Sequence, residues 1–297
     1  MTSLTKVRTL AKMRGGISGL LAPASDFKTI ILPSTVFGVL NSLATSAYGL
    51  DDIPPITLSL ILTRLIQALV WVSLVYIPFG INNQRSPSAI VEDAINKPWR
   101  PLPQNRLSPS QARRLMYCIV LLAPLHGYIY RGIGFRQSSL LRALDIWYNN
   151  VGGADKNPVL RNLLNSLGYL SFITGALEVA LGRQIPFTSD PMSTSGPENR
   201  LALWLLIIGG IVFSTIHLQD LYDQEGDASR GRRTVPLVIG DAPARWTIAT
   251  PMLFWGIVCP RFWRVMIARG VESDRETFRL WNCWISAVYA MPFFAQM

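Results

Sequence analysis

Three aspartates stand close together in the stretch "DLYDQEGDASRGRRTVP", Asp220 to Pro236, which we call the second charged segment. Asp220, Asp223 and Asp227 occupy positions i, i+3 and i+7, which lie on one face of an α-helix. Carboxylates gathered in this way repel one another, and a divalent cation would relieve the repulsion. Oxygen ligands suit Mg²⁺, which commonly binds one or two carboxylates together with substrate phosphates. The alternative is a solvated helix end that carries a run of charges.

Basic residues follow these aspartates at Arg230, Arg232 and Arg233. Guanidinium groups bind phosphate oxygens through paired hydrogen bonds, so the same segment offers ligands for a metal and for a phosphorylated head group. Glu225 falls off the aspartate face, and we do not expect it to be a ligand.

The stretch "EDAINKPWRPLP", Glu92 to Pro103, is the first charged segment. Its charged side chains are Glu92, Asp93, Lys97 and Arg100. Asn82, eleven residues before Asp93, would align with it on an unbroken helix, but Pro87 is expected to interrupt that helix. A polar loop capped by prolines is the alternative. Taken together, the two segments predict a site for an amphiphile with a Mg²⁺-bound diphosphate head and an apolar tail.

The rest of the chain indicates a membrane protein. Of its 297 residues 49% are apolar and only 15% are charged. Soluble domains usually carry about 25% charged residues. At about 20 residues a crossing, the length suits a bundle of about seven to nine helices. The net charge of +10 is compatible with nucleic acid or with membrane, but the basic residues flank apolar runs, so we expect no nucleic-acid partner.

Uncharged runs mark the expected membrane spans. The clearest are Thr29–Leu50, Leu65–Gln84, Leu201–Gln219 and Leu280–Met297, and the shorter ones are Leu115–Tyr130, Asn162–Leu177 and Trp246–Pro260. Leu140–Asn150 and Arg261–Val271 are weaker. Backbone polar groups have no water partners in lipid, so these spans should be helices.

Lysines and arginines predict the orientation. Residues 1–25 form a basic N-terminal segment, the first charged segment is also basic, and a cluster of arginines lies in the second. The positive-inside rule places all three on the cytosolic face. Residues 26–297 are expected to form a single transmembrane domain.

With these motifs the chain resembles the UbiA superfamily of intramembrane prenyltransferases, over roughly Asp26 to the C-terminus. The family carries N-D-x-x-D-x-x-x-D followed by N-K/R-P-x-R-P, and "EDAINKPWRPLP" matches the later part, with Asp93 at the final aspartate. The family's second motif, D-x-x-D-x-x-x-D, is matched by Asp220, Asp223 and Asp227. The resemblance implies an all-α, polytopic bundle of about nine transmembrane helices around a central cavity that holds a Mg²⁺-bound diphosphate.

The first motif departs from the usual family pattern. "NNQRSPSAIVED" has Asn83 and Gln84 where N-D would start, and it is similar to the NQ-x-x-S-x-x-ED variant of fungal UbiA-type terpene cyclases. The stretch "IWYNNVGGADKNPVLRNLLNSLGY", Ile146 to Tyr169, also resembles that branch. The resemblance therefore implies a Mg²⁺-dependent cyclase that ionises a prenyl diphosphate, farnesyl diphosphate by analogy, and closes it to a sesquiterpene hydrocarbon.

This hypothesis assigns roles to individual residues. Asp93, Asp223 and Tyr148 are the expected catalytic residues. The expected metal-binding set consists of Asn83, Glu92, Asp93, Asp220, Asp223 and Asp227. Lys97, Arg100, Arg232 and Arg233 would hold the diphosphate. Aromatic faces stabilise cations, and Trp147, Tyr148, Tyr169 and Phe172 lie in the middle of the chain, although packing or interface roles are the alternative for each.

Two other functions remain open. A UbiA-type prenyltransferase would pass the prenyl group to an aromatic or lipid acceptor, and a transporter or scaffold would also place charges within a bundle. For the enzyme we expect a multi-pass protein of the endoplasmic reticulum, with its active site facing the cytosol, whose partners are the prenyl diphosphate and the lipid bilayer. No obligate protein partner is inferred.

Overall fold

The computed structural model describes residues 26–48, 50, 57–122, 128–185 and 197–263, and every regular element among them is helical. The α-helices are α3 (Leu32–Leu43), α4 (Leu58–Gln84), α5 (Pro87–Asn96), α6 (Pro109–Leu121), α8 (Phe135–Asp145), α9 (Pro158–Leu181), α10 (Pro197–Thr215), α11 (Gln224–Arg230), α12 (Val235–Ile239) and α13 (Asp241–Phe262). Short π-helices form η1 (Phe27–Ile31) and η3 (Ile146–Asn150), and 3₁₀-helices form η2 (Thr45–Tyr48) and η4 (Ile216–Leu221).

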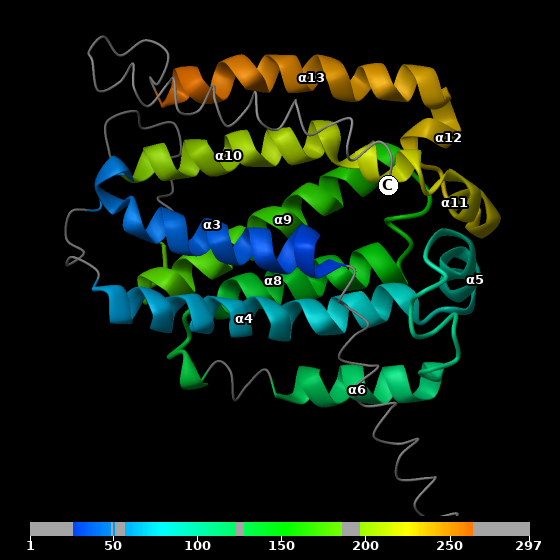
Figure 1. The fold of residues 1–297 in the computed structure, drawn as a ribbon, viewed down its shortest axis with the longest axis horizontal. Helices are drawn as coiled ribbons and strands as arrows, with labels where there is room; N and C mark the ends of the chain where they lie inside the picture. Colours follow the sequence, from blue (N-terminus) through cyan, green and yellow to red (C-terminus); the bar gives the residue numbers. More distant parts are fainter. Residues whose placement is uncertain (1–25, 49, 51–56, 123–127, 186–196, 264–297) are drawn as a thin grey trace, which may run out of the picture.

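The long helices lie side by side in a bundle, with α9 running through its middle (Figure 1). Helix α9 packs against α3, α4, α8 and α10. It begins where the side chain of Asn157 accepts hydrogen bonds from the backbone of Val159 and Leu160, with Pro158 in the first turn. It ends at Gly182, whose φ of 73 degrees is easily reached only without a side chain. These signals fix the central helix of the fold.

Three helices among the described residues are long and apolar enough to cross a membrane: Ser59–Gln84, Pro158–Leu181 and Arg200–Leu221. The expected all-helical bundle is therefore confirmed, and the expected spans are helical over most of their described residues. The weak stretch Leu140–Asn150 is also helical, as the end of α8 and η3. The expected span Leu280–Met297 and residues 264–271 of the weak stretch Arg261–Val271 lie outside the described residues.

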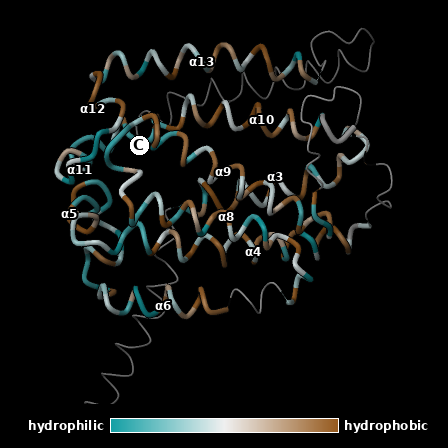
Figure 2. Tube along the Cα trace, turned by 180° about the vertical axis from the view of Figure 1, so that it is seen from behind, coloured by the Kyte–Doolittle hydropathy of each residue, from teal (hydrophilic) through white to brown (hydrophobic). Residues whose placement is uncertain are grey.

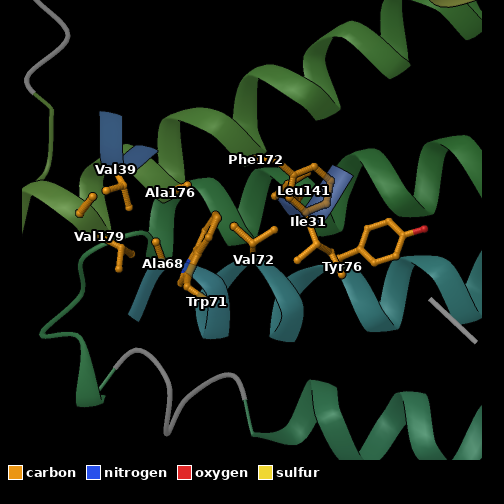
Figure 3. Packing of buried hydrophobic residues seen from close by; sticks show 11 residues of the cluster. Ile31, Val39, Ala68, Trp71, Val72, Tyr76, Leu141, Phe172, Ala176 and Val179 are labelled. Carbon is orange, nitrogen blue, oxygen red and sulfur yellow. The ribbon is translucent and has the colours of Figure 1, made fainter. Parts of the chain in front are cut away.

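A buried apolar cluster joins α3, α4, α8 and α9 (Figure 3). Trp71 and Val72 of α4 are completely buried there and lie between Val39 of α3 and Phe172 of α9. An added Cβ on Gly175 would overlap the ring of Trp71, so the indole fits only because this position of α9 has no side chain. The cluster holds the central helix against its neighbours.

Hydrophilic segments gather at one end of the bundle, around α5 and α11 (Figure 2). Helix α4 ends at Gln84, and α5 starts again at Pro87, capped by the Ser86 side chain. The interruption expected at Pro87 is therefore present. It sets α5 apart from α4 and places the first charged segment at the end of the bundle.

Candidate functional site

The two charged segments lie in contact, because α5 packs against α11. The side chain of Asn96 joins them by two hydrogen bonds. Its Nδ2 donates to the backbone oxygen of Asp223 at 2.9 Å, and its Oδ1 accepts from the backbone nitrogen of Gly226 at 3.0 Å. A Cβ on Gly226 would overlap the amide of Asn96, so only glycine permits this close approach. We call this pair of bonds the Asn96 clasp.

Ion pairs cross between the same segments. Lys97 Nζ lies 2.5 Å from Asp223 Oδ2. Glu92 accepts from two arginines of the other segment, from Arg232 at 2.6 Å and from Arg230 at 2.9 Å. Acidic side chains of each segment thus form ion pairs with basic side chains of the other. Residues more than 120 positions apart in the sequence therefore form one site.

Asp93 lies on the same buried side of α5 and is held by Arg100. The Arg100 Nη1 donates to both carboxylate oxygens, at 2.7 and 3.0 Å, and Nη2 reaches Asp26 at 3.2 Å. Burial raises the pKa of Asp93 above its ordinary value, and the positive charge of Arg100 opposes this rise. Asp93 is thus a desolvated carboxylate whose ionised form depends on neighbouring cations.

The aspartates of the second charged segment do not share one α-helix, contrary to the expectation from their spacing. Asp220 belongs to the 3₁₀-helix η4, Asp223 precedes the first residue of α11, and Asp227 lies within α11. The change of helix type alters the rotation between successive residues. Asp220 and Asp227 are nevertheless both buried at 1% exposure, and Asp223 is 7% exposed.

Arg161 of α9 binds the first of these aspartates. Its Nη2 and Nε donate to the Asp220 carboxylate at 3.0 and 3.4 Å, and its Nη1 donates to the hydroxyl oxygen of Tyr148 at 2.8 Å. Tyr148 was expected to be catalytic, and the structure ties it to an acid of the predicted metal-binding set through a single guanidinium group.

Asp227 pairs with Arg232 at 3.2 Å. Burial raises the pKa of Asp227 to about 6, although Arg161 and Arg232 act in the opposite direction. Burial thus makes ionisation of Asp227 less favourable than in water, and a nearby divalent cation would lower this pKa.

The head-group site, as we call these linked ion pairs, has an excess of acids among the residues that the structure describes. Its carboxylates are Asp26, Glu92, Asp93, Asp155, Asp220, Asp223 and Asp227, and its cations are Lys97, Arg100, Arg161, Arg230 and Arg232. Seven carboxylates against five cations leave two negative charges when all are ionised. This excess suits a divalent cation.

Free oxygens of the site fit Mg²⁺. Two carboxylate oxygens of the site, Asp223 Oδ1 and Asp227 Oδ2, are buried and have no hydrogen-bond partner in the part of the chain that the structure describes. Asn83 Oδ1, near the end of α4, is likewise buried without a partner there. Asp223 and Asp227 are four residues apart and joined by a helical hydrogen bond. No three acidic, histidine or cysteine side chains within the described residues already converge as a metal cage. The donors therefore fit Mg²⁺ bound by one or two carboxylates and a phosphate, rather than by protein alone.

A cavity of about 50 Å³ adjoins the head-group site through Tyr148. Its lining combines aromatic residues with aliphatic and polar ones: Ile30, Phe79, Leu141, Leu144, Asp145, Tyr148, Leu164, Asn165, Gly168, Tyr169 and Phe172. Trp147, in contrast, is 45% exposed and lies outside this lining. This cavity is small, since ligand pockets usually have volumes of about 300–1,000 Å³, and of the predicted catalytic, metal-binding and diphosphate-binding residues only Tyr148 lines it.

Some sequence expectations have a different outcome in the structure. Arg233 is exposed, and the contact it makes with the site is a hydrogen bond from its backbone nitrogen to the oxygen of Asp155. The sequence analysis assigned no role within the site to Asp26, Asn96, Asp155 or Arg161. A signal existed for Asp155 and Arg161, because "ADKNPVLR" places charges on either side of a helix start before an apolar run. Asn96 is the first residue of the N-K/R-P-x-R-P motif, but the motif does not indicate that this residue joins α5 to α11.

Comparison with known proteins decides the family. The UbiA prenyltransferase family matches residues 31–271. This chain belongs to the UbiA prenyltransferase family. The fumagillin beta-trans-bergamotene synthase of Aspergillus fumigatus is 31% identical over 244 residues, which cover 82% of this chain and 77% of that protein. The somaliensene A/B synthase of Streptomyces somaliensis is 28% identical over 225 residues, covering 67% and 70%.

A solved structure agrees with the fold of this UbiA-family chain. The structure of a UbiA homolog from Archaeoglobus fulgidus, bound to GPP and Mg²⁺, superposes with a TM-score of 0.57 at 12% identity, over 94% of this chain and 88% of that one. The resemblance inferred from the two charged segments is therefore confirmed. The chain is a membrane protein of a family of enzymes that act on prenyl diphosphates.

Proposed function

We propose that this chain is a Mg²⁺-dependent terpene cyclase that ionises farnesyl diphosphate and closes it to a sesquiterpene hydrocarbon. One observation carries the proposal: Arg161 links the acids of the head-group site to Tyr148, which lines an aromatic cavity. A polar site for a charged head and an apolar cavity for its tail thus adjoin at one side chain. The 31% identity to a bergamotene synthase supports a cyclase rather than a transferase.

The proposed ligands for the head of the substrate come from both charged segments and from the end of α4. Asp223, Asp227 and Asn83 have free oxygens for Mg²⁺, and Asp93, Glu92 and Asp220 complete the proposed set. When bound, Mg²⁺ neutralises charge that develops on the diphosphate oxygens. Lys97, Arg100 and Arg232 would donate to the same oxygens, and Arg232 Nη2 is buried with no partner among the described residues.

The reaction breaks the bond between the allylic carbon and the diphosphate oxygen, and both electrons leave with the diphosphate. A double bond of the same chain then attacks the allylic cation, and a new carbon–carbon bond forms. Loss of a proton to the diphosphate turns the last cation into a neutral hydrocarbon. No acceptor molecule is needed.

Two properties of the cavity favour this course. The rings of Phe79 and Tyr148 have centroids 5.9 Å apart. Aromatic faces of this kind stabilise a cation that lies over them. The lining residues Tyr148, Leu164 and Phe172 are all buried. These buried walls would limit the access of water that quenches the cation.

The test is product analysis by gas chromatography and mass spectrometry. Microsomes with the full chain receive farnesyl diphosphate and Mg²⁺ alone, and we expect a volatile hydrocarbon. Product that forms only after an aromatic or lipid acceptor is added would establish the prenyltransferase instead.

Asp93→Asn and Asp223→Asn should each lower turnover at least about 100-fold, in line with the loss of a transition-state contact. The control is Asp241→Asn, an exposed carboxylate of α13. Full activity of both site variants would refute the proposal.

The location is part of the same proposal. The head-group site lies at one end of the bundle, among basic segments that the positive-inside rule assigns to the cytosol. We propose a multi-pass protein of the endoplasmic reticulum that takes its prenyl diphosphate from the cytosolic side.

A further inference from the structure

Gly168, in the middle of α9, has no evident structural reason to be glycine. Its φ is not among the positive values of the described glycines. An added Cβ would meet no heavy atom within 4 Å, whereas one on Gly175 of the same helix would collide with Trp71. Glycine inside a helix costs about 1 kcal/mol relative to alanine. Neither backbone geometry nor close packing therefore accounts for that cost at Gly168.

Gly168 does line the cavity. Leu164, Gly168 and Phe172 follow one another at intervals of four residues, so they share one face of α9, and all three contribute to the lining. Leu164 and Phe172 are buried at 3% and 4% exposure, so this face is directed into the protein. The missing side chain at Gly168 thus widens the cavity between a leucine and a phenylalanine.

The same helix also carries the head-group site. Arg161 precedes Gly168 by seven residues, which is about 10 Å along the helix axis, and Phe172 lies about 6 Å further. A substrate whose head lies near Arg161 would extend its tail along this face, past Gly168 and toward Phe172. The cavity of about 50 Å³ is far smaller than a prenyl tail, so the space left by a missing side chain in its wall affects which tails fit.

We propose that Gly168 determines the length of the prenyl tail that the chain accepts, because it leaves the space through which the distal isoprene units pass. The inference rests on the proposed function, since the direction of the tail follows from the position of the diphosphate. It adds a specificity-determining residue to that function. A side chain at position 168 should exclude longer tails and leave short ones unaffected.

The experiment uses Gly168→Ala and Gly168→Leu in the full chain, with Gly256→Ala as the matched control. Gly256 is also a mid-helix glycine whose added Cβ would meet no heavy atom within 4 Å, but it lies on α13 and does not line the cavity. Specificity constants are measured for ten-, fifteen- and twenty-carbon prenyl diphosphates. Each prenyl diphosphate is also tested as a competitive inhibitor, so that one that binds without reacting is still detected.

For each variant we compare the specificity constant for the longest prenyl diphosphate that the wild type accepts with that for the shortest one that binds. In Gly168→Ala this ratio should fall at least about tenfold, because one methylene in a tight apolar pocket has an effect of this size. Gly168→Leu should lower it further, and Gly256→Ala should not change it. The melting temperature of Gly168→Ala should equal or exceed that of the wild type, because alanine is the better helix former.

Two outcomes would overturn the inference while the proposed function stands: an unchanged chain-length preference in Gly168→Ala, or an equal loss for all three lengths. If the wild type converts none of the three diphosphates, the proposed function itself fails, and this inference fails with it.

Discussion

At the scale of single residues, Arg161 connects the charged and the apolar parts of the site. Its guanidinium donates to Asp220 through two nitrogens and to the Tyr148 hydroxyl through the third. Asp220 is 1% exposed and Tyr148 7% exposed, so both contacts are shielded from water. A planar group with fixed donor directions can hold two partners in this way, whereas the single ammonium of lysine cannot.

Arg161→Lys should therefore lower kcat/KM about 100-fold although the positive charge is kept, in line with the cost of about 2–5 kcal/mol for disturbing a buried, hydrogen-bonded charge pair. The matched control is Arg245→Lys. Arg245 pairs with Asp241 on α13, and its side chain is 61% exposed. Solvent screens such a pair, so activity should stay unchanged. The measurements are product formation from farnesyl diphosphate and the melting temperature in detergent. Normal turnover by Arg161→Lys would show that the bidentate contact is dispensable.

At the scale of elements, the contact between α5 and α11 brings the two charged segments together. The Asn96 clasp satisfies a backbone oxygen and a backbone nitrogen at the start of α11, where a helix leaves its first N–H groups without partners. The ion pairs that surround the clasp depend on the same spacing. The head-group site thus forms only when the two short helices approach closely.

Gly226→Ala tests this approach. The new Cβ would overlap the Asn96 side chain, so the amide must move and give up both hydrogen bonds of the clasp. Two such bonds contribute about 1–3 kcal/mol, and we expect turnover to fall at least about tenfold while the bundle still folds. Gly256→Ala, where the added Cβ meets no neighbour, is the control and should retain activity. Equal activity of the two variants would exclude a role for the clasp.

Much of this arrangement could be predicted from the sequence, because it depends on local signals. Charge clusters beside apolar runs identified both segments, and Pro87 indicated the interruption between α4 and α5. The helix type of the second segment was not predictable in the same way. The spacing of Asp220, Asp223 and Asp227 fits an α-helix, but residues 216–221 form the 3₁₀-helix η4, which packs against α9, α10, α12 and α13, and α11 starts only after Asp223. The partner choices of Asn96 and Arg161 depend on contacts between remote segments, which no local pattern encodes.

At the scale of the whole molecule, the bundle has an apolar exterior and one hydrophilic end. Large apolar side chains are exposed on its outer helices, including Leu206 on α10 and Leu253 and Ile257 on α13. Exposed apolar side chains on the outer helices suit contact with lipid. The hydrophilic end is formed by α5 and α11 (Figure 2). The molecule should therefore cross the membrane with the head-group site at one surface.

Single cysteines can locate the two ends. In a background in which Cys118, Cys259 and Cys283 are replaced by serine, Ser110→Cys reports on the end that carries the site and Ser59→Cys on the far end of α4; both serines are exposed. Helix α4 has 27 residues. At the usual rise per residue it is about 40 Å long, enough to separate the two ends by a bilayer.

A membrane-impermeant maleimide should label Ser110→Cys in sealed microsomes whose cytosolic face is outward, because the basic segments favour that face. It should label Ser59→Cys only after the membrane is permeabilised. The reverse pattern would place the head-group site in the lumen, where prenyl diphosphates from the cytosol could not reach it directly. Labelling of both cysteines in sealed vesicles would mean that α4 does not cross the bilayer, since only a spanning helix keeps its two ends on opposite sides.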